Sequence, residues 1–142
     1  MKLDSRCFSQ EAYRGLIALK DGDVTNERNC RVEQNFHKKA SGLIQGLSTY
    51  ISTWGLHRLS GDAAKFLNGT GEKTIYKGKV YREFLYRLKS FSGQDFNPEN
   101  EGTLVNMPLR EYAALNHLAI QLAKEWSFWS AAILGEPEEE EG

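Results

Sequence analysis

The residue types that most often carry out catalysis or bind metal ions are few in this chain and are not spaced for either task. The histidines are His37, His57 and His117, and none has a second histidine or a carboxylate at the spacing of a metal site. Glu111 and Glu125 share one predicted helix, where capping and surface charge explain them better than an acid–base pair does. We therefore expect no catalytic residues, no metal, no cofactor and a protein that is not an enzyme.

The segment 69–74 contains some residues of a nucleotide-binding loop, but in the wrong order. That loop needs a contiguous Gly-Lys-Ser/Thr between a strand and a helix. Here Glu72 separates Gly71 from Lys73, and the residues before the segment have a helical pattern. The segment is therefore predicted to be a turn that ends a helix, and not a nucleotide site.

The distribution of charge is more informative than its sum. The chain has 18 Lys and Arg against 19 Asp and Glu, a net charge of −1. Residues 28–89 contain twelve basic and four acidic residues, whereas residues 90–142 contain two basic and ten acidic ones. A net charge of +8 followed by one of −8 indicates a surface with a basic side that attracts an anion and an acidic side that repels it.

Several basic residues recur at helical spacing within the positive segment. Lys79, Arg82, Tyr86 and Lys89 are separated by three, four and three positions, so they form one stripe on a helix. Such a stripe can follow the phosphates of a nucleic acid without reading its bases, but it is equally typical of the solvated exterior of a helical bundle. The candidate nucleic-acid-binding residues are Arg28, Arg31, Lys38, Lys39, Arg58, Lys79, Arg82, Arg87 and Lys89.

The elements that position these residues are predicted to be helices. No stretch alternates between apolar and polar residues for long enough to demand a sheet. Trp126 and Trp129 have the spacing of core residues, but they could also face a partner. Residues 92–107 are predicted to form a long loop that is either functional or poorly ordered. The segments with helical periodicity are about 9–20, 25–54, 56–67, 75–91 and 108–134.

Length and composition set the broad class. A chain of 142 residues, 40% of them apolar, is long enough for one core, and no apolar run reaches the ~18 residues of a membrane span. The start of the sequence lacks the apolar region of a secretory signal, and Cys7 and Cys30 form no CxxC pair, which together favour a reducing cytoplasm. We expect an all-α fold, a compact bundle of about five helices in one domain over residues 1–135, with an acidic disordered tail over residues 136–142.

A pattern of apolar and aromatic residues resembles a known protein family. Residues 50–56 read Tyr-Ile-Ser-Thr-Trp-Gly-Leu, and residues 62–67 read Asp-Ala-Ala-Lys-Phe-Leu. Residues 107–112, Met-Pro-Leu-Arg-Glu-Tyr, then lead into a helix that contains Trp-Ser-Phe-Trp at 126–129. This order, over roughly residues 30–134, resembles the small subunit of type III CRISPR RNA-guided effector complexes, of the Cmr and Csm kinds.

The resemblance implies a non-enzymatic helical bundle of the antiviral defence system, stacked in several copies inside a ribonucleoprotein. Such subunits contact the backbone of the duplex between guide RNA and target RNA through basic side chains, while base pairing supplies the sequence specificity. The implied partners are both RNA strands, the backbone and large subunits of the complex, and further copies of the chain. The family's basic contacts do not occupy a fixed motif, so no residue role is carried over.

Two other interpretations stay open at this stage. The basic side could instead belong to a helical adaptor that docks an acidic protein partner. An enzyme whose site the sequence does not reveal is a third, weaker alternative. Under the RNA interpretation, the acidic tail could compete with RNA for the basic face.

Overall fold

The computed structural model describes residues 5–23 and 28–137; it is 77% helical and contains no strand within these ranges. The all-α class predicted from the sequence is confirmed. In chain order the elements are α1 (Ser5–Asp21), the 3-10 helix η1 (Gln34–Phe36), α2 (His37–Gln45), α3 (Leu47–Trp54), α4 (Leu56–Leu67), α5 (Glu72–Ser92), α6 (Gly102–Val105) and α7 (Leu109–Leu134).

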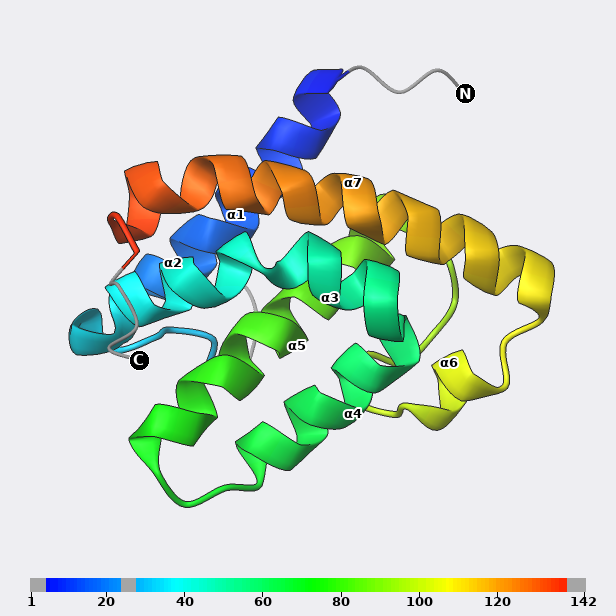
Figure 1. The fold of residues 1–142 in the computed structure, drawn as a ribbon, viewed down its shortest axis with the longest axis horizontal. Helices are drawn as coiled ribbons and strands as arrows, with labels where there is room; N and C mark the ends of the chain where they lie inside the picture. The colour runs from blue at the N-terminus through cyan, green and yellow to red at the C-terminus, as the bar shows by residue number, and fades with distance from the viewer. Residues whose placement is uncertain (1–4, 24–27, 138–142) are drawn as a thin grey trace.

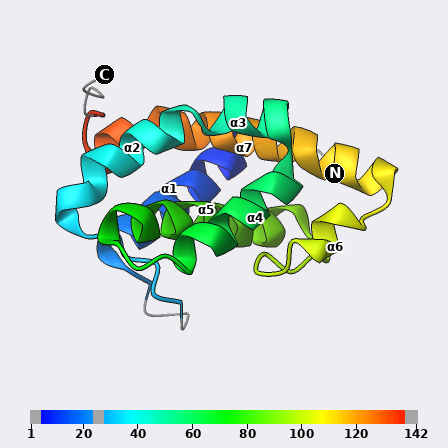
Figure 2. The same cartoon turned by 60° about the horizontal axis from the view of Figure 1, so that its bottom comes forward.

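The longest helix, α7, lies along the whole molecule and organises the bundle (Figure 1). It packs against α1 on one side and against α2 and α3 on the other. The hairpin of α4 and α5 lies beneath this layer, as the rotated view in Figure 2 shows. The layers meet where the Phe84 ring of α5 contacts the fully buried Trp126 ring of α7 edge-on, with centroids 5.2 Å apart. Trp126 is therefore a core residue.

A glycine allows the two helices of the α4–α5 hairpin to approach closely. A Cβ atom at Gly78 would lie 2.8 Å from the backbone nitrogen of Leu67, which is too close for any other residue without a backbone shift. The turn between the helices contains Gly69 and Gly71. It is short, since α4 ends at Leu67 and α5 begins at Glu72. Residues 69–71 thus lie in the turn that the sequence predicts, residues 72–74 begin α5, and the element before the turn is the helix α4 and not the strand that a nucleotide-binding loop follows.

The predicted helix over residues 25–54 differs from the structure in two places. Residues 28–33 are not helical; Thr25 itself lies outside the described residues. Val32 is fully buried and donates its backbone N–H to the Leu19 carbonyl at 2.7 Å, which holds this segment against α1. A second break falls at Gly46, between α2 and α3, because glycine is a poor helix former. Arg28 and Arg31 therefore lie on an extended segment and not on a helix.

The predicted loop over residues 92–107 is held against α4 by buried contacts. Phe96 and Leu104 are each at most 2% exposed, and Leu104 lies in the short helix α6. The Ser60 hydroxyl of α4 donates to the carbonyl oxygen of Pro98 at 3.2 Å. This segment is thus part of the packed structure.

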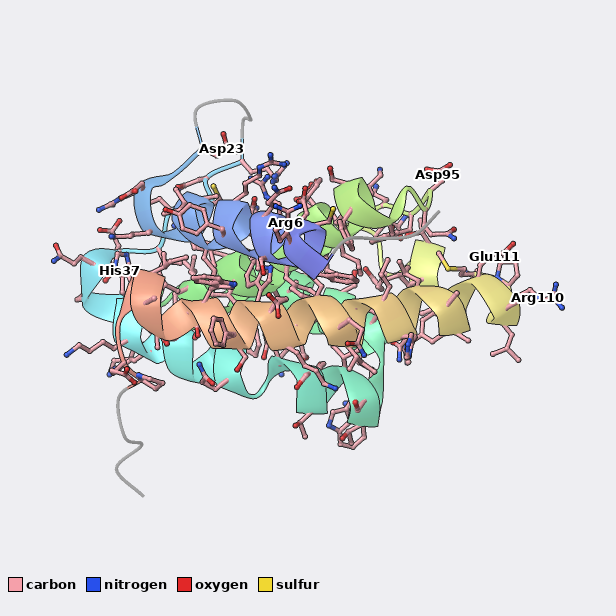
Figure 3. The ribbon with its side chains drawn as sticks, turned by 90° about the horizontal axis from the view of Figure 1, so that it is seen from above. Arg6, Asp23, His37, Asp95, Arg110 and Glu111 are labelled. Atoms are coloured by element: carbon pink, nitrogen blue, oxygen red, sulfur yellow. The ribbon has the colours of Figure 1, made fainter. Side chains whose placement is uncertain are left out.

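Different elements lie at the two ends of the molecule's long axis. The α4–α5 turn and the start of α2 lie at one end, and α6 with the start of α7 lies at the other (Figures 1 and 2). Viewed from above, His37 lies at the first end, while Asp95 and Glu111 lie toward the second (Figure 3).

None of the described helices combines the length and apolar character that crossing a membrane requires. Residues 138–142 of the expected acidic tail lie outside the described residues.

Candidate nucleic-acid interface

The basic stripe predicted for α5 faces another segment of the chain over part of its length. Lys79 donates from Nζ to the carbonyl oxygen of Arg31 at 2.8 Å, and Arg82 donates from Nη2 to that of Asn29 at 2.9 Å. Both acceptors belong to the extended segment 28–33, which therefore lies along this side of α5. In the structure these two cations bind the backbone of their own chain.

Three of the candidate arginines are held by carboxylates. Arg28 and Arg87 both bind Glu83, at 3.3 and 3.1 Å, and the side chain of Glu83 is fully buried. Arg87 also binds Asp23 at 2.9 Å, which ties α5 to the end of α1. With the Arg82–Glu99 pair, 3.9 Å apart, these contacts form a group that we call the arginine network: Asp23, Arg28, Arg82, Glu83, Arg87 and Glu99.

The arginine network is part of the packed structure of the protein. Its three arginine side chains are only 15–22% exposed, and the guanidinium of Arg28 lies 3.8 Å from the centroid of the Tyr86 ring. Burial, followed by the hydrogen bond that Tyr86 donates to Glu99, raises the pKa of Tyr86 to about 12. A buried carboxylate needs such partners, because an unpaired charge in the interior is very unfavourable. Phosphate binding here would have to displace these carboxylates.

Two further candidates lie at the edge of the arginine network. Arg31 is 46% exposed and lies 3.5 Å from Glu33, so this pair is screened by solvent. Lys89 lines an open cleft of ≈ 620 Å³ together with Arg28, Arg87 and Tyr86. The same cleft is lined by Asp23 and Asp95, so it presents both signs of charge. Neither candidate adds to a continuous positive surface.

A second group of cations, at the end of the bundle, is differently placed. We call Lys39, Lys65, Lys73 and Lys77 the lysine cluster. They come from the first turn of α2, the last turn of α4 and the first two turns of α5. Among the described residues, none of their ammonium groups has a carboxylate within 4.0 Å, and all but the half-buried Lys77 are exposed.

Aromatic rings lie beside three of the four lysines in the cluster. The ammonium groups of Lys65 and Lys77 lie 5.8 and 5.6 Å from the centroid of the Phe66 ring. The ammonium group of Lys39 lies 5.6 Å from the Phe36 ring, which stacks on the Tyr76 ring of α5 at 5.1 Å. The ammonium groups of these three lysines therefore lie beside aromatic rings. This arrangement concentrates positive charge on one end of the molecule.

The remaining candidates lie outside both groups. Lys38 is exposed next to Lys39, and its Cγ lies near Gly135, where the chain leaves α7. Arg58 is exposed at the start of α4, with its guanidinium 4.4 Å from the centroid of the Trp54 ring. Of the nine predicted residues, only Lys39 belongs to the lysine cluster, and Lys38 adjoins it.

Some of these residues were absent from the predicted set. Lys73 and Lys77 extend the predicted basic stripe toward the start of α5, and Lys65 lies next to the apolar Phe66. A signal for this group was available, since a predicted hairpin of two helices brings the end of one beside the start of the next. Glu83 was also missed, although its spacing of four from Arg87 is that of an ion pair on a helix.

Two of the histidines have structural partners. His37 Nε2 lies 2.8 Å from the carbonyl oxygen of Val32, and His57 Nδ1 lies 2.7 Å from Tyr112 Oη. Over residues 5–23 and 28–137, no three side chains of His, Cys, Asp and Glu come together as metal ligands. Burial and then the charge of Glu83 raise the pKa of the buried Cys30 thiol, which makes it a poor nucleophile.

In comparisons with known proteins, no family model matches this chain. No curated protein matches its sequence, and no solved structure matches its fold.

Proposed function

We propose that this protein is a non-catalytic small subunit of a type III CRISPR ribonucleoprotein effector that contacts the RNA backbone through its basic end. The observation that carries the proposal is the lysine cluster, a group of cations without carboxylate partners among the described residues. Free ammonium groups gathered on one surface attract phosphates and release their condensed counterions, whatever the base sequence. The residue pattern that resembles the small-subunit family supports the same assignment.

The opposite end of the molecule carries exposed acidic residues, which favours RNA binding at the lysine end. Asp95, Glu101 and Glu111 are exposed in the segment around α6 and the start of α7. A negative end repels phosphates and leaves the lysine end as the favourable surface for an RNA strand. The proposed interface therefore comprises the first turn of α2 and the α4–α5 turn, with Lys38 at its margin.

Fluorescence polarisation with a labelled single-stranded RNA of about 20 nucleotides, and with the matching RNA duplex, tests the proposal. We expect sequence-independent binding that weakens steeply between about 50 and 200 mM salt. Replacing Lys39, Lys65, Lys73 and Lys77 by Gln should weaken binding by at least about tenfold and reduce the salt slope for a single strand by about 3.

A matched control separates the lysine cluster from overall charge. Arg14, Lys20, Arg110 and Lys124 are exposed and lie outside the cluster, so their replacement by Gln lowers the net charge by the same amount. This control should bind RNA within about threefold of the unmodified chain. Equal losses in the two variants, or no binding at low salt, would contradict the proposal.

Purification from the native host, followed by sequencing of the bound RNA, tests the assignment to an effector complex. We expect guide RNA together with further subunits of the complex. Recovery of the protein without RNA from an intact lysate would contradict the proposal.

A helical adaptor for an acidic protein is the second candidate function. The observation in its favour is the lysine cluster itself, because its ammonium groups would attract the carboxylates of an acidic protein as well as phosphates. Binding of a polyglutamate peptide as tightly as RNA of equal charge, in the same polarisation assay, would favour the adaptor over the RNA-binding subunit.

A further inference from the structure

A tryptophan at the end of α3 is exposed beside a cation. The Trp54 side chain is 50% exposed, whereas Trp126 is fully buried. The guanidinium of Arg58 lies 4.4 Å from the centroid of the Trp54 ring, and Arg58 is itself exposed. No carboxylate of the described chain lies within ion-pair distance of Arg58. The pair therefore presents an aromatic surface together with a positive charge.

The corner between α3 and α4 fixes the position of this pair. Gly55 has a φ of +86°, and a Cβ atom there would lie 2.3 Å from Tyr112 Oη, so only glycine fits. The Asn116 side chain accepts a hydrogen bond from the backbone N–H of Leu56 at 3.1 Å. This bond, and the contact of His57 Nδ1 with Tyr112 Oη at 2.7 Å, attach the corner to α7. Trp54 and Arg58 are consequently held on a rigid part of the fold, and little order is lost when a ligand binds them.

One face of α4 connects this pair to the lysine cluster. Arg58 and Lys65 are seven residues apart, so they lie on the same face of the helix, about 10 Å from each other along its axis. Gly61 lies between them, and a Cβ atom there would meet nothing within 4 Å, so the backbone is open to close approach. The nearby Asp62 carboxylate accepts a hydrogen bond from Tyr50 at 2.5 Å, which draws it toward α3.

We propose that Trp54 and Arg58 form a stacking site for one unpaired nucleobase of single-stranded RNA, whose neighbouring phosphates follow α4 to the lysine cluster. The inference rests on the proposed function, because the lysine cluster supplies the other end of the track. An aromatic ring with a nearby cation is a typical platform for a base that has left its stack, since every base offers an aromatic face. An apolar protein partner would gain nothing from the exposed cations of this face.

The stacking site would make the interface prefer single-stranded RNA to a duplex, a preference that a lysine surface alone would not have. A continuous duplex keeps its bases stacked and cannot offer one to Trp54. An adenine-rich single strand should therefore bind more tightly than a duplex of the same length. A strand of abasic sugar phosphates with the same number of charges should bind as the lysine cluster alone would bind it.

The test compares labelled oligoadenylate with an abasic oligomer of equal length in the polarisation assay. For the unmodified chain, oligoadenylate should bind about tenfold more tightly than the abasic strand. Trp54→Ala should remove this difference, and Trp54→Phe should keep most of it, because phenylalanine still stacks. Phe128→Ala is the matched control: Phe128 is 70% exposed on α7, far along the chain from this corner, and its loss should leave the difference unchanged.

Tryptophan fluorescence provides a second readout. Trp54 is the most exposed of the three tryptophans, so oligoadenylate should quench the emission of the unmodified chain and should not quench that of Trp54→Ala. Equal preference for oligoadenylate in Trp54→Ala and the unmodified chain would overturn the inference while leaving the proposed function intact. Absence of binding to both probes would overturn the proposed function and the inference together. Unchanged RNA binding with weaker self-association in Trp54→Ala, measured by analytical ultracentrifugation, would identify a protein contact instead.

Discussion

The arginine network and the lysine cluster come from the same positive segment of the sequence but use their charges in opposite ways. In the arginine network, Arg28 and Arg87 share the buried carboxylate of Glu83. In the lysine cluster, the ammonium groups of Lys65 and Lys77 lie near the Phe66 ring, with no carboxylate of the described residues within ion-pair distance. One region stabilises the fold with its cations, and the other keeps them available for a ligand.

The chemistry of the two side chains explains this division. The planar guanidinium of Arg87 offers several donors at once, so it can bind Glu83 and Asp23 together while it is largely buried. The ammonium group of lysine is strongly hydrated, and its stem can cover an apolar ring while the charge stays in water. A segment with a net charge of +8 therefore does not amount to a surface of that charge.

Removal of the buried carboxylate should have the largest effect. Glu83→Gln removes the carboxylate that Arg28 and Arg87 share. We expect unfolding free energy to fall by about 3 kcal/mol, as measured by urea denaturation. Lys65→Gln, the control from the exposed region, should change it by less than about 0.5 kcal/mol. Equal stability of Glu83→Gln and the unmodified chain would show that the arginine network does not stabilise the fold.

Two single substitutions, one in the lysine cluster and one in the arginine network, test whether the two regions have different roles. Lys77→Gln should weaken RNA binding by about threefold with little change in stability, since its ammonium has no carboxylate partner within the described ranges. Arg87→Gln should lower the unfolding free energy by about 1–2 kcal/mol and leave RNA binding within twofold. Polarisation and urea denaturation measure the two effects. The reverse outcome, in which Arg87→Gln costs more affinity than Lys77→Gln, would move the interface to the arginine network.

Neutralising the acidic C-terminal residues should have a smaller effect, which is a gain in RNA binding at the lysine cluster. Gly135 and Pro137 lie beside Lys38 and Gly42 of α2, so residues 138–141, all Glu, follow a point next to the basic end. Their replacement by Gln should strengthen RNA binding by about threefold at low salt and by little at high salt. Polarisation at both salt concentrations measures this. Replacement of Asp95, Glu101 and Glu111 at the far end is the control, and an equal gain there would indicate a general effect of net charge.

Alkaline pH should weaken the arginine network slightly, through the phenol of Tyr86. Burial, with the bond to Glu99, raises the pKa of Tyr86 from 10.0 to about 12, so the folded state favours the protonated phenol. This contribution is fully present below pH 10 and is lost as pH rises from 10 toward 12. Urea denaturation over this range should show a steeper loss of stability in the unmodified chain than in Tyr86→Phe. Identical pH profiles would show that the phenol does not contribute.

The elements of the bundle were largely accessible from the sequence. The predicted bounds of 56–67 agree with α4 (Leu56–Leu67), and the last helix ends before Gly135 as expected. Within the predicted helix 75–91, Val80, Phe84 and Leu88 are fully buried at steps of four, as helical periodicity requires. These predictions depend on local periodicity and on glycine at a helix end, both of which a single sequence displays.

The residues of the candidate site could be predicted from the sequence only in part. The positive segment is visible in the sequence, but of the nine residues chosen only Lys39 lies in the lysine cluster. Arg28 and Arg31 were assigned to a helix that begins only at Gln34. The burial of Val32 against α1 decided that, and it is a contact between segments that local periodicity does not report.

By itself, the sequence determined that the chain is helical, where most of its helices end, and that positive charge concentrates in one segment. Tertiary structure decided most of the neutralisation of those charges. Arg87 reaches Glu83 through their spacing of four on α5, whereas only the packing of segment 28–33 against α5 brings Arg28 to the same carboxylate. The α4–α5 turn leaves Lys65 and Lys77 without such a partner in the described structure. Charge is a property of each residue, whereas its availability depends on which groups the fold places within a few ångströms.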